Sequence, residues 1–172
     1  MPLREPAAVG FTGVLTPLQV KQLRDDEAGY DLKPAKTDRV DQRRGVVAWL
    51  DSWKNWAQDT LQAINDHAFG FDLDGIETPQ YALYNAGDFF AWHMDKGAGE
   101  KHRKLSMTVQ LSEPSEYDGG ELELRTGADI VIAPSESGSA IAFPSWILHR
   151  VTPVTRGVRR ALVVWAYGAA FR

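Results

Sequence analysis

The sequence predicts a mainly β fold, a sandwich or jelly roll of eight strands preceded by helices, and three observations support this prediction. Two segments within the first 75 residues have helical periodicity. After Gly75, short apolar or alternating runs recur between clusters of Gly, Pro, Asn, Asp and Ser. No internal repeat or Pro/Ser-rich linker interrupts the chain. The eight runs are Gln80–Asn85, Phe89–Asp95, Lys104–Ser112, Glu121–Arg125, Ile130–Ala133, Ser139–Pro144, His149–Val154 and Arg160–Tyr167.

The first helix is expected over residues 16–26. Thr16 would be its N-cap and Pro17 its first residue, with Leu18 and Leu23 on the apolar side. A second helix is expected over residues 52–69, capped by Ser52 and ended by Gly70. Its apolar residues at near-helical spacing are Trp56, Leu61 and Ile64. Both helices should cover one outer face of the β fold.

Composition limits the class of protein. At 172 residues the chain suits one domain over 1–172, with 1–75 as a helical support and 76–172 as the β core. The net charge of −4 argues against a nucleic-acid partner. Without cysteine, any metal must be bound by histidine and carboxylate groups. No signal peptide or membrane span is recognisable, so a cytoplasmic protein without a membrane partner is expected.

A candidate metal site lies in the β region. His93 and Asp95 are two positions apart on one predicted strand, so their side chains should share a face. His149 begins the seventh predicted strand, and in a two-sheet roll the second and seventh strands can lie next to each other. Two histidines and one carboxylate with open positions are typical of non-haem iron(II) oxygenases. An isolated His-x-Asp more often marks a surface pair, and His67 and His102 lack comparable context.

Three stretches together resemble a known family: YALYNAGDFFAWHMD, RKLSMTVQLSEPSEYDGGELEL and GSAIAFPSWILHRVTPVTRGVRRALVVWAYG. They are similar to the prolyl-hydroxylase-type branch of the 2-oxoglutarate- and iron(II)-dependent dioxygenases, in particular the PKHD-type hydroxylases of bacteria and phage. The resemblance covers roughly Tyr81–Gly168. It implies a double-stranded β-helix, Fe(II) bound by His93, Asp95 and His149, 2-oxoglutarate and O2 as co-substrates, and ascorbate as a reductant. It also implies hydroxylation of a C–H bond, with succinate and CO2 released.

The resemblance also implies a co-substrate pocket. Arg159 matches the basic residue that binds the distal carboxylate of 2-oxoglutarate, and an arginine fork suits a buried carboxylate. Arg159 shares its strand face with an apolar row, whereas its neighbour Arg160 should be solvated. Tyr84 matches a tyrosine that reaches the co-substrate. Ser106 and Gln110 match positions that line the pocket, although the family often has Thr and Tyr there.

The substrate is not determined by these motifs, and the resemblance favours a prolyl or other residue of a peptide or protein over a small molecule. The charged segment Lys33–Gly45 is interpreted as a solvated loop, with a lid over the site as the alternative. Trp146 is a candidate for the substrate entrance, while Trp92 should pack outside the barrel.

Three other functions remain open. An AlkB-like oxidative demethylase of nucleobases shares the metal motif, but it usually has a second arginine at a spacing that is missing after Arg159. A non-catalytic, cupin-like binding protein would use the same roll without turnover. A hydrolase or isomerase with another divalent metal would leave the role of Arg159 unexplained.

Overall fold

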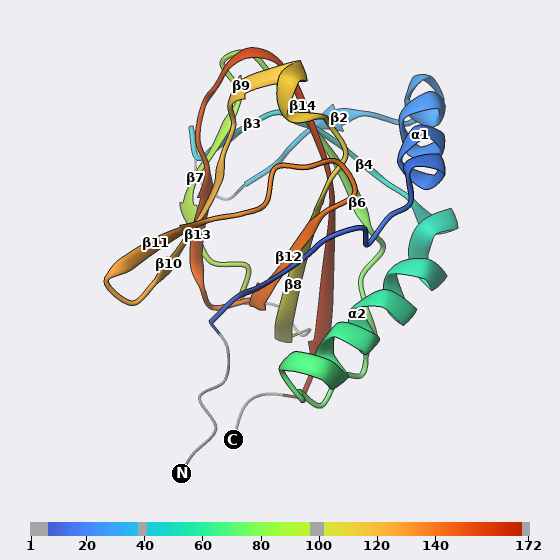
Figure 1. Ribbon diagram of the computed structural model, residues 1–172, viewed down its shortest axis with the longest axis vertical. Helices are drawn as coiled ribbons and strands as arrows, with labels where there is room; N and C mark the ends of the chain where they lie inside the picture. Colours follow the sequence, from blue (N-terminus) through green and yellow to red (C-terminus); the bar gives the residue numbers. More distant parts are fainter. Residues whose placement is uncertain (1–6, 38–40, 97–101, 170–172) are drawn as a thin grey trace.

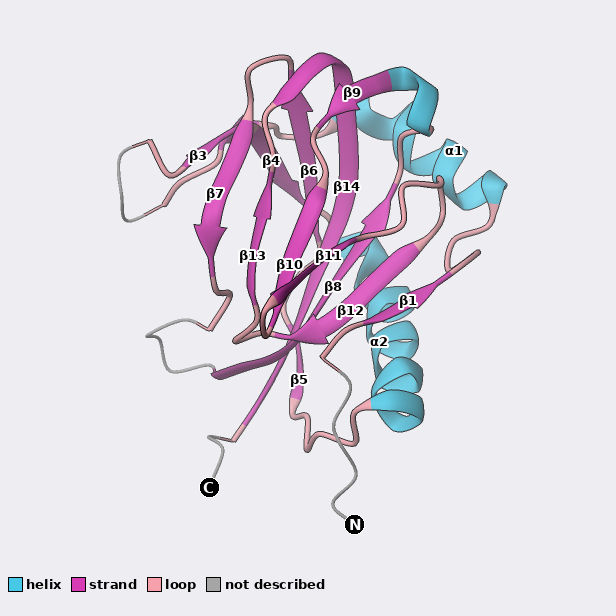
Figure 2. Cartoon of the chain, turned by 60° about the vertical axis from the view of Figure 1, so that its left-hand side comes forward, coloured by secondary structure: helices cyan, strands magenta, loops and turns pink. Residues whose placement is uncertain are grey.

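A computed structural model of the chain describes residues 7–37, 41–96 and 102–169, and within them the strands form a nine-stranded and a five-stranded sheet. Figures 1 and 2 show the smaller sheet across one face of the larger, with both α-helices on the opposite face. In spatial order the larger sheet contains β1 (Val9–Phe11), β12 (Ala140–Pro144), β8 (His102–Gln110), β14 (Val154–Gly168), β6 (Gln80–Asn85), β4 (Val46–Trp49) and β2 (Lys33–Pro34), with β5 (Gly75–Ile76) and β9 (Tyr117–Gly119) paired to β14. The smaller sheet contains β11 (Asp129–Ile132), β10 (Leu122–Thr126), β13 (Leu148–Val151), β7 (Phe89–His93) and β3 (Arg43–Arg44).

The predicted mainly β fold is confirmed, and each of the eight predicted runs overlaps a strand, although β14 begins six residues earlier than expected, at Val154 instead of Arg160. The number of strands was underestimated, because β1 to β5 and β9 were not predicted. These strands have two to four residues, too few to show a period, and several are charged. Pairing with longer neighbours makes them strands, as where β3 pairs with β7. The expected loop at Lys33–Gly45 therefore contains β2 and β3.

The N-terminal part contributes to the sheet as well as to the helices. Strand β4 pairs with β6 over four residue pairs, from Val46 opposite Leu83 to Trp49 opposite Gln80. The expected division into a helical support before residue 75 and a β core after it therefore does not describe the sheets. Within the described residues, no helix is long and apolar enough to cross a membrane.

The first helix, α1 (Pro17–Asp25), begins as predicted. The hydroxyl of Thr16 accepts the backbone N–H of Gln19, and the side chain of Gln19 completes a capping box. Val20 and Leu23 are the buried residues of this helix, whereas Leu18 is 75% exposed. The prediction for Leu18 was wrong. Leu18 is two positions from the buried Val20, and residues two positions apart on a helix point to nearly opposite sides.

The second helix, α2 (Lys54–Ala68), ends before Gly70, as predicted. The N–H of Gly70 bonds to the carbonyl of Asn65 at 2.7 Å, and its φ is +68°. Its start differs from the prediction. Ser52 lies in a 3-10 turn, Asp51–Trp53, and no side chain caps the helix. Helical spacing identified Leu61 and Ile64 as buried residues of this helix, but it does not show where the preceding turn ends and the helix begins.

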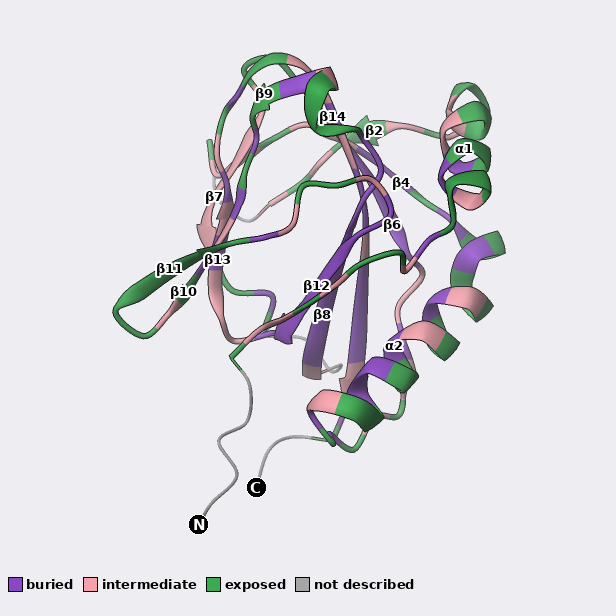
Figure 3. Ribbon diagram, in the orientation of Figure 1, coloured by how far each residue is buried: buried purple, intermediate pink, exposed green. Residues whose placement is uncertain are grey.

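Apolar side chains form two cores on opposite faces of the larger sheet. One core joins the helices to the sheet and includes Leu23, Leu61 and Leu162. The other fills the space between the two sheets and includes Tyr84, Leu124 and Phe143. Figure 3 shows β8, β12 and β14 buried along most of their length between these cores. The inner faces of β7 and β13 also meet the larger sheet's side chains in this space.

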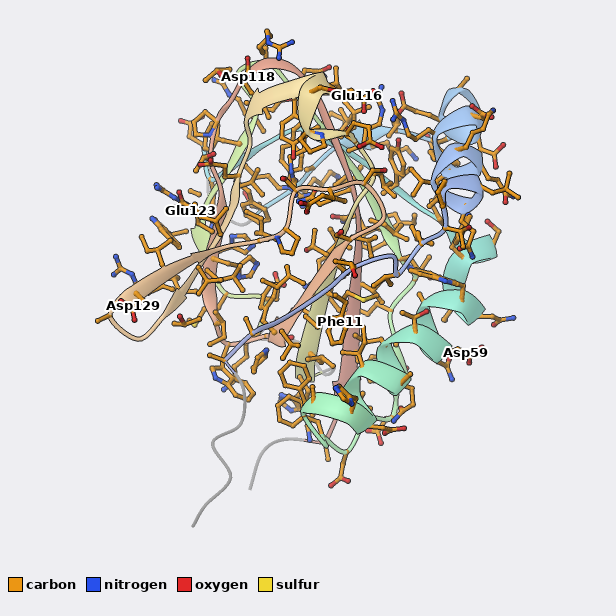
Figure 4. All side chains as sticks on the ribbon, in the orientation of Figure 1. Phe11, Asp59, Glu116, Asp118, Glu123 and Asp129 are labelled. Carbon is orange, nitrogen blue, oxygen red and sulfur yellow. The ribbon has the colours of Figure 1, made fainter. Side chains whose placement is uncertain are left out.

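A half-buried polar network fixes the turn after α1 to the larger sheet. The carboxylate of Glu27 accepts hydrogen bonds from the hydroxyl of Tyr81 and from Nε of Arg160, each at 2.5 Å. Nearby, Arg24 on α1 pairs with Glu116, the residue labelled near the top of Figure 4. Arg160 was expected to be solvated, but its side chain is only 19% exposed because Glu27 lies over the outer face of β14.

Candidate metal centre and co-substrate pocket

The three predicted metal ligands come together between the sheets. Strand β7 ends at His93, and β13 places His149 directly opposite it in the antiparallel register. Asp95 was expected on the same strand, but it follows the end of β7, where its N–H bonds to the carbonyl of Ser145 at 2.9 Å. That hydrogen bond holds the loop so that the carboxylate still lies beside both imidazoles.

The geometry of this cluster suits one metal ion. Nε2 of His93 lies 3.5 Å from Oδ1 of Asp95, and Nε2 of His149 lies 3.5 Å from Oδ2 of Asp95. All three ligand atoms lie within 4.8 Å of one another. Ligand atoms bound about 2.1 Å from a shared ion are separated by roughly 3–4 Å. Nitrogen and carboxylate oxygen donors in this combination accept iron(II).

Backbone carbonyls orient both imidazoles. Nδ1 of His93 lies 2.8 Å from the carbonyl oxygen of Ala91, and Nδ1 of His149 lies 2.8 Å from that of Ile147. When Nδ1–H donates to these oxygens, the lone pair of Nε2 points to the metal position. The same i to i−2 contact at both ligands therefore selects the tautomer that binds a metal.

Two side chains from the larger sheet hold the carboxylate ligand. Ser106 on β8 and the indole N–H of Trp165 on β14 each donate a hydrogen bond of 2.8 Å to Oδ2 of Asp95. The hydroxyl of Ser145 lies 2.9 Å from that of Ser106 and extends the network. Such hydrogen bonds fix a ligating carboxylate before the metal binds. Sequence reasoning missed the contact of Trp165, although it placed this residue on the same strand face as Arg159.

The electrostatics of the cluster favour a bound cation. Burial raises the pKa of Asp95, but the neighbouring His149 and His93 outweigh it and hold the pKa well below its usual range. Burial lowers the pKa of His149, but the charge of Asp95 and its hydrogen bond raise it overall. For His93 burial dominates and the pKa is lowered. The site therefore favours an ionised carboxylate at Asp95, whose negative charge attracts a cation.

Arg159 lies in a pocket beside the metal ligands, on the predicted face of β14. The residue is 1% exposed, and its Nε and Nη2 atoms have no hydrogen-bond partner within the described part of the chain. Burial lowers its pKa. Leaving buried donors of a charged group unpaired is costly, so the pocket is suited to an anion. Tyr84 is the register partner of Arg159 on β6, and its ring centre lies 5.6 Å from the guanidinium carbon.

Ser106 and Gln110 were expected to line this pocket, but neither is among the described residues that do so. Ser106 instead contacts Asp95, and Gln110 is buried elsewhere along β8. Thr108, between them on the same strand face, lines the pocket. Strand parity identifies the face of a side chain, but it does not show how far along that face a cavity extends.

Arg43 also lines the pocket, and sequence reasoning did not identify it. It belongs to β3, within the segment that was interpreted as a solvated loop. Its Nη2 donates to Oε1 of Gln80 at 3.1 Å and to the hydroxyl of Tyr84 at 3.3 Å. Its guanidinium lies 4.6 Å from the ring centre of Phe90, which stacks on His93. Because β3 has only two residues, no periodic pattern in the sequence could have placed this side chain.

The two tryptophans considered for the substrate entrance lie away from the pocket. Trp92 packs outside the smaller sheet against the guanidinium groups of Arg125 and Arg150, at 5.6 and 4.7 Å from its ring centre. This agrees with its predicted outward direction. Trp146 packs on Phe71 in the core beneath α2, with ring centroids 5.7 Å apart, so it does not form the entrance.

Comparison with known proteins identifies the family of this chain. The model of the 2OG-Fe(II) oxygenase superfamily matches residues 79–167, which include all three ligands and Arg159. A PKHD-type hydroxylase, YbiX of Escherichia coli, is 32% identical over 89% of this chain and 75% of its own length. The chain belongs to the 2OG-Fe(II) oxygenase superfamily. It is therefore an oxidoreductase of the dioxygenase class that uses Fe(II), 2-oxoglutarate and O2.

Solved structures confirm the jelly-roll fold. A prolyl-4-hydroxylase from Pseudomonas putida superposes with a TM-score of 0.78 at 23% identity, covering 95% of this chain and 94% of that one. The viral collagen prolyl hydroxylase of Paramecium Bursaria Chlorella virus-1 superposes with a TM-score of 0.76 at 18% identity, covering 95% and 97%. Family membership favours an enzyme over a binding protein without turnover, and a dicarboxylate co-substrate accounts for the buried arginine that a zinc hydrolase would not need.

Proposed function

We propose that this chain hydroxylates a C–H bond of a prolyl or other residue in a peptide or protein. In the overall reaction one atom of O2 enters the substrate as hydroxyl, and the other enters succinate as 2-oxoglutarate loses CO2. The observation that supports this proposal is the presence of Arg159, buried with its Nε and Nη2 donors unpaired among the described residues, in one pocket with His93, Asp95 and His149. The names of the similar hydroxylases favour a prolyl residue.

The residues present fit Fe(II), because two imidazole nitrogens and one carboxylate are the donor set that non-haem iron oxygenases use. His93, Asp95 and His149 would hold the ion, which supplies the activation of O2. The hydrogen bonds to these three side chains keep the donor atoms fixed, so that they would bind the ion without rearranging. Ser106 and Trp165 provide this support at Asp95.

Arg159 would bind the distal carboxylate of 2-oxoglutarate, because its free donors match the two oxygens of a carboxylate. The ring of Tyr84 forms the adjoining wall. Apolar residues close the other sides and keep bulk water away from the reacting groups. These residues are Leu122, Val151, Ala161 and Val163.

The first experiment tests the co-substrate complex. Anaerobic addition of Fe(II) and 2-oxoglutarate should give a visible charge-transfer band in the wild-type protein. The band should be absent in His93→Ala and present in the matched control His67→Ala, since His67 is exposed on α2. A wild-type protein without this band would contradict the proposed use of the pocket.

The second experiment identifies the substrate. Proline-containing peptides, other peptides and small molecules are screened for succinate formation together with a mass gain of one oxygen in the candidate. A prolyl peptide that passes both criteria supports the proposal. Formaldehyde release from a methylated oligonucleotide would instead support the AlkB-like alternative, and oxygen gain only in a free small molecule would contradict a peptide substrate.

A further inference from the structure

Arg43 separates the metal pocket from an outer groove. Together with Gln80 it lines both spaces. The groove runs along β2 and β4 and opens to solvent, with Trp49 53% exposed at its wall. The described residues that form the rest of its lining are Asp31, Lys33, Pro34, Lys36 and Val47. A substrate that lies in this groove meets the guanidinium of Arg43 on its way to the metal ligands.

The partners of Arg43 within the described residues are neutral. Its Nη2 donates to the amide oxygen of Gln80 and to the hydroxyl of Tyr84, and its Nε is buried without a partner among those residues. Among the described residues, five other arginines form ion pairs with carboxylates: Arg24, Arg103, Arg150, Arg156 and Arg160. Arg43 and Arg159 are instead directed into the pocket with donors to spare, as expected of groups that bind an anionic ligand.

The charges in the pocket leave one positive charge for the substrate to balance. The described lining contains two guanidinium groups, Arg43 and Arg159, and one carboxylate, Asp95. A divalent ion adds two positive charges, and the two carboxylates of 2-oxoglutarate cancel two. One of those carboxylates is matched by Arg159 and the other by the metal, so Arg43 remains unmatched. An uncompensated charge at a partly buried position favours a ligand of opposite charge.

We propose that Arg43 is a specificity residue that binds a carboxylate of the primary substrate, so that the enzyme prefers peptides with an acidic group close to the hydroxylated residue. This rests on the proposed function. The carboxylate is either the C-terminus of the peptide or an acidic side chain, and both present the same oxygen pair to the guanidinium. Lys33 and Lys36 add positive charge along the outer groove, although Asp31 pairs with Lys33.

The neighbouring aromatic rings prepare Arg43 for this role. Its guanidinium stacks on Phe90, whose ring lies 3.4 Å from that of His93 at an angle of 11°. Only the ring of Phe90 therefore separates the guanidinium of Arg43 from the metal ligand His93. Stacking on Phe90 keeps the planar guanidinium fixed, which lowers the entropy cost of binding a ligand through the donors that Gln80 and Tyr84 do not occupy.

Calorimetry with two peptide pairs tests the inference directly. The full chain is loaded with Zn(II) and 2-oxoglutarate, so that binding is measured without turnover. One pair is acetyl-Gly-Pro with a free carboxylate or an amide at its C-terminus, and the other is acetyl-Gly-Pro-Glu-amide against acetyl-Gly-Pro-Gln-amide. The wild-type protein should bind the carboxylate member of one pair about tenfold to a hundredfold more tightly, and the pair concerned identifies the source of the carboxylate.

Variants show whether Arg43 is responsible. Arg43→Gln should remove the preference for the carboxylate, and Arg43→Lys should retain part of it. The matched control Arg44→Gln should keep it in full, because Arg44 is the exposed neighbour on the same strand. The affinity for 2-oxoglutarate should stay within about twofold of wild type in Arg43→Gln, since Arg159 binds that ligand.

Two results would overturn the inference. One is equal binding of both members in both peptide pairs by the wild-type protein. The other is a loss of 2-oxoglutarate affinity in Arg43→Gln as large as that in Arg159→Met, which would make Arg43 a co-substrate residue. A carboxylate preference in a protein that forms no succinate with Fe(II) would refute the proposed reaction and support this binding site, so the two failures are distinguishable.

Discussion

The indole N–H of Trp165 donates a hydrogen bond of 2.8 Å to Oδ2 of Asp95, which joins the end of the longest strand to the carboxylate ligand of the metal site. Seventy residues separate the two in sequence. Asp95 follows β7 in a loop, so its position depends on contacts from the larger sheet. The hydrogen bond from Trp165, which is held in β14, therefore fixes the position of the Asp95 carboxylate.

Replacing Trp165 with Phe should weaken metal binding. The ring still fills its buried position, but Asp95 loses one of the two side-chain hydrogen bonds that hold Oδ2. Loss of such a support typically lowers metal affinity about 10–100-fold. Competition titration with a zinc chelator measures the change. Trp92→Phe, outside the smaller sheet, is the matched control, and equal affinities for the two variants would show that the hydrogen bond does not position the ligand.

Replacing Arg159 with Met should abolish the stabilisation that 2-oxoglutarate gives to the metal-loaded protein. In the wild type, the ligand should raise the melting temperature by occupying the unpaired donors of the guanidinium. Without ligand, Arg159→Met should be as stable as the wild type or more stable, because it removes an uncompensated buried charge. Thermal unfolding with and without 2-oxoglutarate measures both effects.

The exposed Arg156 provides the control for that experiment, and Arg156→Met should respond to 2-oxoglutarate like the wild type. Metal affinity should be nearly unchanged in Arg159→Met. An equal loss of metal and 2-oxoglutarate binding would indicate that Arg159 supports the structure of the site and does not bind the co-substrate.

Gly120→Ala should disturb both folding and the co-substrate pocket. Its φ of +61° is unfavourable for alanine, and an added Cβ would lie 2.8 Å from Cγ2 of Val154 and 3.1 Å from Cδ of Arg159. The backbone conformation alone costs about 1 kcal/mol of unfolding free energy, and the displaced neighbours should raise the total to roughly 2–3 kcal/mol. The shift of Arg159 should also weaken 2-oxoglutarate binding.

Gly127→Ala separates the two effects, because Gly127 has a φ of +76° and nothing within 4 Å of an added Cβ. Gly127→Ala should reduce the unfolding free energy only by the cost of the backbone conformation, and it should bind 2-oxoglutarate like the wild type. Denaturant unfolding and co-substrate titration of both variants measure the difference. Similar behaviour of Gly120→Ala and Gly127→Ala would mean that the contact with Arg159 has no influence on the pocket.

Glu27→Gln should destabilise the protein by about 2 kcal/mol, because the charge-assisted hydrogen bonds from Arg160 and Tyr81 become weaker. The hydrogen bond from Arg160 lowers the pKa of Glu27 from its ordinary value of 4.5, against the opposing effect of burial. A carboxyl group with a lowered pKa in the folded state stabilises it above the unfolded pKa, and this contribution disappears as pH falls through the folded pKa.

The stability difference between wild type and Glu27→Gln should therefore be full at neutral pH and should shrink as the solution is acidified below about pH 4.5. Urea unfolding at several pH values measures it. Asp59→Asn, on the outer side of α2 (Figure 4), is an acidic control and should leave stability nearly unchanged. A difference that grows on acidification would contradict the assigned role of Glu27.

Local sequence patterns were sufficient to predict the strands that bury a whole face. Four long strands lie between the two cores: β6, β8, β12 and β14. Burial on both faces requires apolar residues in continuous or alternating runs, and such runs are recognisable in the sequence. The same kind of pattern placed His93 and His149 on predicted strands. Strand parity also placed Arg159 on the side that faces the pocket.

The tertiary structure alone decided which residues surround these groups. Arg43 reaches the pocket through β3, whose two residues become a strand only by pairing with β7. Trp165 contacts Asp95 because the two sheets face each other, and Thr108 replaces Ser106 and Gln110 in the lining because of where the cavity ends. Periodicity is a local property of the chain, whereas these contacts depend on the packing distance and register between sheets. The sequence by itself therefore identified His93, Asp95 and His149 as candidate metal ligands and Arg159 as a candidate co-substrate residue. The fold determined which side chains surround and support these groups.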